Sequence, residues 1–254
     1  PEEARYNRDK GAMVKWEGHP LLDNLAQAPT RDEARQRLGI GDQETAIALI
    51  PASRQQEIKY LMPTIFEAAK HLQKRLAQQN KPVRFLIPLS LEKYREAITQ
   101  AVTEFGLKAS IIGRVEMDVR GLPAEDLGQQ PSITCLAGAD LAIAKSGTVN
   151  LEAALLDVPQ AVVYKVSPVT AWIARNILKF SIPFMSIVNL VEMQSVVPEF
   201  LQEAATPEAI AEEAWKILQG SGRQTVLEDY ASVRRALGGG GACKRAADAI
   251  LDAL

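Results

Sequence analysis

Short apolar runs alternate with amphipathic segments over much of the chain, from residue 45 to residue 165. The runs are rich in residues with β propensity and predict strands at 45–50, 83–89, 109–113, 139–145 and 159–165. Between the first two runs, EIKYLMPTIFEAAKHLQKRLAQQ (57–79) places apolar residues at helical spacing. Apolar strands that alternate with helices are typical of a parallel sheet covered on both faces. The pattern therefore predicts an α/β fold with a Rossmann-like parallel sheet.

The remaining segments predict helices and loops around that sheet. SLEKYREAITQAVTEFG (90–106) predicts a helix with Ser90 as its N-cap and Gly106 as its stop. Residues 116–130 are polar and punctuated by glycine and proline, so they predict a loop. Residues 207–253 predict two or three helices, divided by glycines at 220–222 and 238–241. We interpret the four consecutive glycines as a flexible turn, because no strand leads into them as in a phosphate-binding loop.

Composition excludes several classes of protein. The 254 residues are 47% hydrophobic with a net charge of −2, which argues against disorder and against a nucleic-acid-binding surface. Cys135 and Cys243 lie too far apart to suggest a disulfide framework, and with His19 and His71 they form no metal-ligand spacing. This use of cysteine favours a reducing, cytoplasmic compartment. No apolar run approaches the roughly 20 residues that span a bilayer.

Candidate chemistry first appears at the junction AIAKSGTVNLEAALLD (142–157). Ligands of parallel sheets bind beyond the carboxyl ends of the strands, where Ser146, Gly147 and Thr148 are expected. We expect Ser146 or Gly147 to cap the next helix, leaving first-turn amides that suit a phosphate. Glu152 follows just over one turn later and can accept hydrogen bonds from a vicinal diol such as a ribose. The alternative is an ordinary helix cap followed by a lone surface acid.

A second candidate loop, PASRQQE (51–57), follows the first predicted strand. It presents Ser53 and Arg54, and the guanidinium group of Arg54 matches the geometry of phosphate oxygens. A surface arginine after a turn is the alternative. Since both loops are expected at the same edge of the sheet, their coincidence favours a shared site.

Two further polar residues stand in distinctive surroundings. His19, in GHPLLD, can donate to a ligand or stabilise its own turn. Asn189 lies in the otherwise apolar stretch SIVNLVEMQSVVPEFLQ and needs hydrogen-bond partners from the backbone or from a ligand.

The stretch TAWIARNILKFSIPFM (170–185) combines bulky apolar residues with the cations Arg175 and Lys179. Such a basic, apolar helix can lie at a membrane interface. The alternative is a helix that is buried in the core or in a contact between subunits.

Five segments together resemble the lipid-A-disaccharide synthases, which form glycosyltransferase family 19 and have the two-domain GT-B fold. They are, in order, GHPLLD, LIPASRQQEI, AKSGTVNLEAALLDVPQAVVYKVSP, TAWIARNILK and NLVEMQSVVPEFLQE. The resemblance implies that residues 1–30 are the end of an acceptor-side domain or a linker. Residues 31–203 would form the Rossmann-like UDP-sugar-binding domain, and residues 204–254 the C-terminal helices.

The resemblance also implies an activity. A diacylglucosamine unit would move from its UDP carrier to a diacylglucosamine 1-phosphate, with inversion and without a metal or other cofactor. The enzyme would be cytoplasmic and peripheral on the inner membrane, and family members can form homodimers by exchanging C-terminal segments.

The same resemblance assigns roles to the candidate residues. Amides near residues 146–148, together with Arg54, would stabilise the pyrophosphate of the departing UDP. Glu152 would bind the ribose hydroxyls, and Ser53 and His19 belong to the matching motifs. Asn189 matches an asparagine of the family's active-site region, so Arg54 and Asn189 are the catalytic candidates.

The sequence departs from the family pattern at two places. Ala52 stands where glycine is common, and Glu192-Met193-Gln194 stands where the family commonly has Ala-Gly and a cation. Loss of that cation would weaken binding of a phosphate group.

The resemblance further predicts that the acceptor-side domain and its general base precede residue 1. This chain alone would then bind UDP but transfer little sugar. Two alternatives remain: another UDP-GlcNAc-using GT-B enzyme, such as the GlcNAc transferase of peptidoglycan synthesis or a UDP-GlcNAc 2-epimerase, and a non-catalytic nucleotide-binding module.

Overall fold

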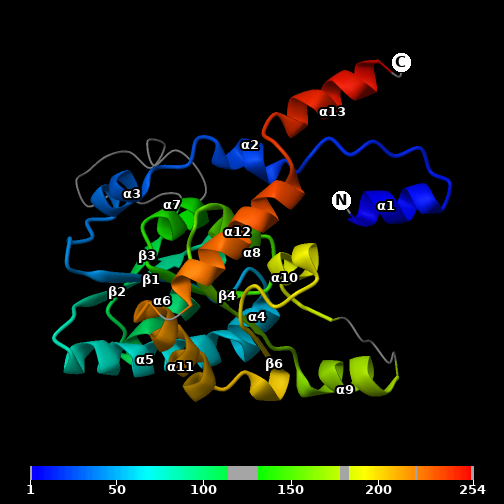
Figure 1. The fold of residues 1–254 in the computed structure, drawn as a ribbon. Helices are drawn as coiled ribbons and strands as arrows, with labels where there is room; N and C mark the ends of the chain where they lie inside the picture. The colour runs from blue at the N-terminus through cyan, green and yellow to red at the C-terminus, as the bar shows by residue number, and fades with distance from the viewer. Residues whose placement is uncertain (1, 114–130, 178–182, 221, 253–254) are drawn as a thin grey trace.

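The computed structural model describes residues 2–113, 131–177, 183–220 and 222–252, apart from the side chains of residues 2, 3, 174 and 175. Its centre is one parallel sheet with the strand order β3-β2-β1-β4-β5-β6 (Figure 1). The strands are β1 (Thr45–Ile50), β2 (Val83–Pro88), β3 (Ala109–Ile112), β4 (Leu141–Lys145), β5 (Gln160–Tyr164) and β6 (Glu199–Leu201). The five predicted strands and the Rossmann-like sheet are confirmed, whereas β6 was not predicted.

The strand order reverses between β1 and β4. From β1 the chain moves outward through β2 and β3, and then returns to place β4 on the other side of β1. Ile50 pairs with Ala144, so the two strands end side by side. Open α/β sheets bind ligands in the crevice outside the carboxyl ends of the strands at such a reversal.

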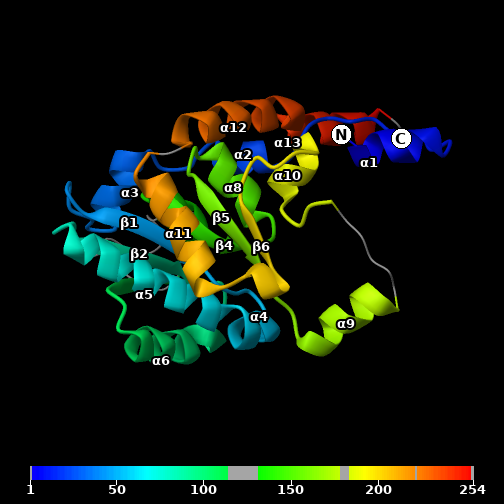
Figure 2. The same cartoon turned by 60° about the horizontal axis from the view of Figure 1, so that its bottom comes forward.

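One face of the sheet packs against α4 (Gln55–Tyr60), α5 (Met62–Gln78), α6 (Arg95–Phe105) and α11 (Pro207–Leu218) (Figure 2). Alternate strand residues, including Ile47, Phe85 and Ile143, are fully buried in this core. Because successive side chains of a strand point to opposite faces, their neighbours Ala48 and Ala142 enter the core on the other face.

The opposite face packs against α3 (Arg31–Arg37), α7 (Pro131–Ala137) and α8 (Val149–Leu155). Helices α2 (Leu21–Leu25), α10 (Ile187–Glu192) and α12 (Arg223–Leu237) continue this layer beyond α8. Thus both faces of the sheet are covered, and this accounts for strands whose residues are almost all apolar.

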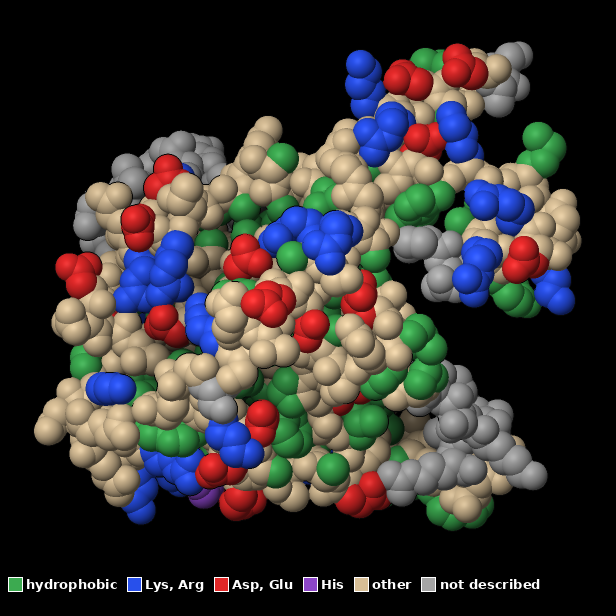
Figure 3. Space-filling view, in the orientation of Figure 1, with side chains coloured by type: hydrophobic (Ala, Val, Ile, Leu, Met, Phe, Trp, Pro, Cys, Tyr) green, Lys and Arg blue, Asp and Glu red, His purple; other side chains and the backbone are tan. Residues whose placement is uncertain are grey.

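Three helices project from the compact body: α1 (Glu2–Asp9), α9 (Pro168–Asn176) and α13 (Ala242–Leu251) (Figures 1 and 2). Trp172 on α9 is 58% exposed, and Ile177, the C-cap residue of this helix, is 61% exposed. Elsewhere on the face seen in Figure 3, side chains of both charges are interspersed, in keeping with the small net charge. Within the described residues, no helix is both long enough and apolar enough to cross a membrane.

Some local predictions need correction. The helix predicted over 57–79 is divided into α4 and α5 near Leu61, where Pro63 in the first turn of α5 has no amide hydrogen to continue the α4 ladder. Ser90 is not an N-cap: its hydroxyl donates to Ala52 O at 3.1 Å, and a 3₁₀ turn, η1 (Glu92–Tyr94), leads into α6. Gly106 does end α6, in the left-handed conformation with φ 64°.

The tail predicted over 207–253 contains three helices in its described part, α11, α12 and α13, with the glycines at their junctions. A second short 3₁₀ turn, η2 (Gln202–Ala204), connects β6 to this tail. The loop predicted at 116–130 lies outside the described residues, and so does Lys179.

Candidate functional site

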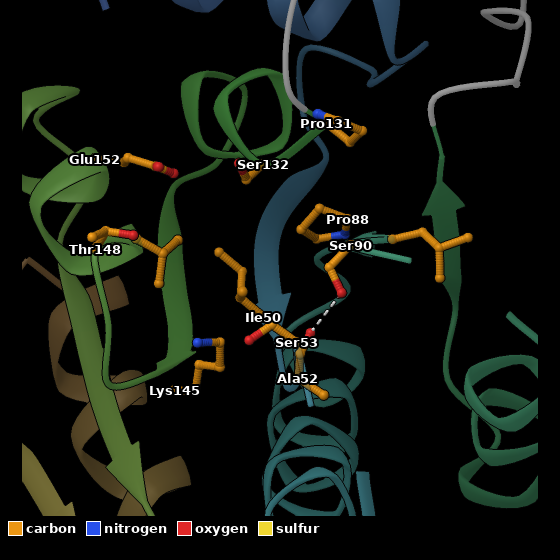
Figure 4. A pocket seen from close by; sticks show the side chains of 12 residues that line it. Ile50, Ala52, Ser53, Pro88, Ser90, Pro131, Ser132, Lys145, Thr148 and Glu152 are labelled. Atoms are coloured by element: carbon orange, nitrogen blue, oxygen red, sulfur yellow. Dashed lines mark hydrogen bonds between the residues drawn. The ribbon is translucent and has the colours of Figure 1, made fainter. Parts of the chain in front are cut away.

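A cavity of about 250 Å³ opens at the carboxyl ends of β1, β2 and β4, next to the reversal of strand order (Figure 4). Both loops that the sequence singled out contribute to it. Its lining consists of Ile50, Ala52, Ser53, Pro88, Leu89, Ser90, Pro131, Ser132, Lys145, Thr148, Val149 and Glu152. The expectation that these two loops meet at one edge of the sheet is therefore confirmed.

Glu152 is the buried acid of this cavity. Only 8% of the residue is exposed, and its side chain receives a hydrogen bond from Ser132. Burial raises the pKa of the Glu152 carboxyl, although the Ser132 hydrogen bond and the positive charge of Lys145 act in the opposite direction. Among the described residues, its Oε2 atom has no hydrogen-bond partner. A buried acceptor without a partner is costly for stability and is free to bind a donor from a ligand.

Asn150 shapes the loop between β4 and α8. Its Oδ1 accepts from the Gly147 amide at 2.9 Å, and its Nδ2 donates to Lys145 O at 3.1 Å. The N-cap position of α8 belongs to Thr148, whose side chain forms no capping bond. The loop is thus held by a buried amide inside the helix, and the prediction that Ser146 or Gly147 caps α8 is wrong.

The four backbone amides between the end of β4 and the first residue of α8 differ in what they bind. The Ser146 amide donates to Val163 O, and the Gly147 amide is used by Asn150. In the part of the chain that the structure describes, the amides of Thr148 and Val149 have no acceptor. The Ser146 hydroxyl donates to Met185 O at 2.5 Å and does not line the cavity.

Lys145 places a positive charge in the cavity, close to the loop that follows β1. Its Nζ lies 3.8 Å from Glu57 Oε1, and its side chain is only 16% exposed. Glu57 also organises the loop after β1, because its Oε2 accepts from the amides of Ser53 at 2.5 Å and Arg54 at 3.0 Å. Glu57 therefore connects Lys145 to the Ser53 turn.

Arg54 and His19 do not line the cavity. Arg54 is exposed at the start of α4. His19 is half-buried, with Nδ1 accepting from Leu21 N at 3.1 Å and its own amide donating to Leu237 O at 3.0 Å. Burial lowers the pKa of the His19 imidazole. These contacts support the interpretation of His19 as a residue that stabilises its own turn.

Asn189 is fully buried, and its side chain is occupied by the protein. Its Nδ2 donates to Val197 O at 2.9 Å and Glu199 Oε1 at 2.7 Å. Its Oδ1 accepts from the amides of Val196 and Val197, both at 2.9 Å. A side-chain amide has two donor hydrogens and two lone pairs, so none is left for a ligand. The structure thus favours backbone partners for Asn189, which lies outside the lining.

The family of the chain follows from comparison with known proteins. The model of the lipid-A-disaccharide synthetase family matches residues 1–253. The chain belongs to this family. A lipid-A-disaccharide synthase of Gloeothece citriformis is 54% identical over 99% of this chain, and one of Synechocystis is 44% identical over the same share. In both cases the chain spans 60% of the length of the relative.

Two solved structures with a similar fold have low sequence identity to this chain. S. aureus MnaA, solved with UDP, has a TM-score of 0.60 at 13% identity. The match covers 97% of this chain and 57% of the MnaA chain. The UDP-GlcNAc 2-epimerase of Neisseria meningitidis, solved with UDP-GlcNAc, has a TM-score of 0.58 at 14% identity. The match covers 99% of this chain and 59% of the epimerase chain. At these identities the likeness concerns the fold alone.

The structure describes both places at which the chain departs from the pattern expected of lipid-A-disaccharide synthases. Ala52 is absent from the described non-glycine residues with positive φ, so its turn does not require glycine. Met193, in contrast, has φ 51° and ψ 32° at the C-cap of α10, a conformation that glycine adopts at little cost. Glu192 accepts a hydrogen bond from the Ser232 hydroxyl at 2.8 Å and thereby joins α10 to α12.

Lys145 and Ser132 line the cavity, but sequence reasoning did not name them as candidate site residues. Lys145 directly follows the apolar part of a strand and begins the loop KSGT, which is a recognisable signal. Ser132 carries no such signal, because α7 brings it to Glu152 from a distant part of the sequence. Among the described residues, no three His, Cys, Asp or Glu side chains gather closely enough to hold a metal ion.

Proposed function

We propose that this chain carries the UDP-sugar-binding domain of a lipid-A-disaccharide synthase, with residues 31–203 forming that domain. The reaction transfers a diacylglucosamine unit from UDP to a diacylglucosamine 1-phosphate, forms a β-1′,6 bond with inversion, and releases UDP. The observation that carries the proposal is the unpartnered, buried Oε2 of Glu152 in a cavity at the strand-order reversal. Membership of the family supports the choice of substrates.

In this proposal Glu152 accepts hydrogen bonds from the ribose hydroxyls of UDP. The free amides of Thr148 and Val149, which begin α8 beside the same cavity, face the developing charge of the leaving group. Donors that are already in place stabilise such charge without having to reorganise during the reaction. Ser53 lines the cavity and can add a hydroxyl, whereas Arg54 reaches a phosphate only if its exposed side chain turns inward.

The acceptor, the membrane and a second subunit are further parts of the proposal. The chain spans 60% of the length of two curated relatives, and UDP binding is the part of the reaction that we expect of the 254 residues. The exposed Trp172 of α9 and Ile177 at its C-cap support peripheral contact with a cytoplasmic membrane surface or with a second copy of the chain.

Calorimetric titration with UDP tests the proposal. Glu152→Gln keeps the shape of the side chain and removes its charge, and we expect it to weaken UDP binding by about 10- to 100-fold, since hydrogen bonds to charged groups contribute roughly 1.5–3 kcal/mol each. Glu104→Gln, an exposed acid on α6, is the matched control and should leave the affinity unchanged. Equal affinity of wild type and Glu152→Gln removes Glu152 from the site, and a wild-type chain that does not bind UDP contradicts the proposed function.

Product analysis separates this function from that of another UDP-GlcNAc enzyme. A lipid-A-disaccharide synthase with this domain should transfer the acylated glucosamine unit from acylated UDP-glucosamine. It should leave unacylated UDP-GlcNAc unchanged. Epimerisation or transfer of the unacylated sugar would support the alternative enzymes. UDP binding without transfer from any acyl donor, in a chain as long as the curated relatives, would support a non-catalytic module.

A further inference from the structure

The ammonium group of Lys145 is largely buried but has one long ionic contact, with Glu57, among the described residues. Of the cavity's lining residues, all of which lie in the described part of the chain, it is the one cation. Its contact with Glu57 Oε1, at 3.8 Å, is longer than the 2.7–2.9 Å typical of a charge-assisted hydrogen bond. A largely buried charge is expensive unless it is closely paired. Lys145 is therefore a cation with unused hydrogen-bond donors inside a ligand-sized cavity.

Glu57, in contrast, does not depend on Lys145. Its Oε2 accepts from the amides of Ser53 and Arg54, at 2.5 Å and 3.0 Å. These bonds to the backbone remain if Lys145 moves away. The ion pair between Lys145 and Glu57 can thus be exchanged for a stronger anion at a low cost to the loop.

The two charges of the cavity lie at different ends. Figure 4 shows Glu152 and Ser132 at one end, whereas Lys145 lies at the other, toward Ser53. A ligand that carries hydroxyls at one end and a polyanion at the other fits this arrangement. A nucleoside diphosphate has this polarity, and its diphosphate carries more negative charge than the single carboxylate of Glu57.

We infer that Lys145 leaves Glu57 when the donor nucleotide enters and pairs with its diphosphate. The inference rests on the proposed function, because it assigns a residue to the diphosphate of the same UDP ligand. Lys145 then determines how strongly the site prefers a nucleoside diphosphate over the bare nucleoside.

The test compares affinities for UDP and for uridine, measured by titration followed by NMR. For Lys145→Met, which keeps the length of the side chain, we expect a 10- to 100-fold loss of UDP affinity and a change of at most about twofold for uridine. Lys145→Arg keeps the charge and should retain most of the preference for UDP. The wild-type UDP affinity should also fall more steeply with added salt than that of Lys145→Met.

Lys70→Met is the matched control. Lys70 Nζ lies 3.7 Å from Glu67 Oε1 on α5, a similar distance to that between Lys145 and Glu57, but Lys70 does not line the cavity. It should keep the wild-type ratio of UDP to uridine affinity. If Lys145→Met also keeps that ratio, whether both affinities stay or both fall, the inference is overturned. If the wild-type chain binds neither ligand, the proposed function itself fails.

Discussion

The buried side chains of Asn150 and Gln160 hydrogen-bond to each other, with Asn150 Nδ2 3.0 Å from Gln160 Oε1. Gln160 Nε2 continues the chain of bonds to Tyr230 Oη at 3.2 Å. At the other end, Asn150 holds Lys145 O and the Gly147 amide. This buried network therefore ties α12 to the loop that presents Lys145 to the cavity.

The network predicts that Asn150→Ala impairs both stability and binding. The substitution leaves several buried polar groups unpaired, at a cost of about 2–4 kcal/mol in the free energy of unfolding. We also expect weaker UDP binding, measured calorimetrically, because the loop loses the side chain that shapes it. Tyr230→Phe removes only the distant hydroxyl and should cost about 1 kcal/mol with little change in UDP affinity. Undiminished UDP affinity in Asn150→Ala would show that the loop keeps its shape without this residue.

Glu152 predicts a conflict between binding and stability. Burial raises the pKa of its carboxyl in the folded state, so the folded chain binds this proton more tightly than the unfolded chain does. Stability is therefore lost as the pH rises from the unfolded value of about 4.3 through the raised folded value, and stays lower above it. Glu152→Gln removes this cost. We expect it to raise the free energy of unfolding at pH 7.5 and to give no such gain below about pH 4.

Urea unfolding at the two pH values measures this difference, and calorimetry of the same variant measures UDP binding. A variant that is more stable and binds UDP less tightly is the outcome expected of a residue kept for its ligand. If Glu152→Gln gains the same stability at both pH values, the gain does not come from removing the ionised carboxylate of Glu152.

The sheet was predictable because its strands are continuous apolar runs. TAIALI and LAIAK read as strands without any knowledge of their neighbours, since both of their faces are buried. The strand β6 (Glu199–Leu201) was missed because three residues, none of them fully buried, carry no periodic signal. Its position is set by pairing with β5, a contact between distant parts of the chain.

The candidate site was predictable in part. Glu152 and Thr148 were found because they follow a strand in a pattern typical of nucleotide sites, and the structure places both in the cavity. Asn189 became a catalytic candidate because it matches an asparagine of the family's active-site region, whereas its apolar surroundings left both backbone and ligand partners open. The sequence does not show that the chain turns back at Val196 and Val197 to supply them.

We therefore expect substitutions of Asn189 to lower the stability of the fold and not to act directly on UDP binding. Asn189→Ala leaves the amide of Val197 without its acceptor and takes one donor each from Val197 O and the carboxylate of Glu199. It should lower the free energy of unfolding by about 2–4 kcal/mol. Asn189→Asp should be at least as harmful, because it places a second carboxylate next to Glu199. Chemical unfolding measures both variants. A fully stable Asn189→Ala with reduced UDP affinity would instead support a direct role at the ligand.

The backbone conformation of Met193 predicts that its replacement by glycine stabilises the protein. This residue stands where the chain departs from the pattern expected of its family. A residue with a Cβ atom pays roughly 1 kcal/mol or more for the left-handed conformation, whereas glycine does not. The side chain of Met193 is 59% exposed, so little packing is lost on its removal. We expect Met193→Gly to raise the free energy of unfolding by about 0.5–1 kcal/mol, after the greater freedom of glycine in the unfolded chain is included.

Asn80→Gly is the matched control for this prediction. Asn80 has φ 56° just beyond α5, but asparagine tolerates the left-handed region better than methionine does, so its replacement should gain less. Urea unfolding of the two variants compares the gains. If Met193→Gly is no more stable than wild type, contacts of the Met193 side chain offset the backbone cost, and the departure from the family pattern at this position stabilises α10.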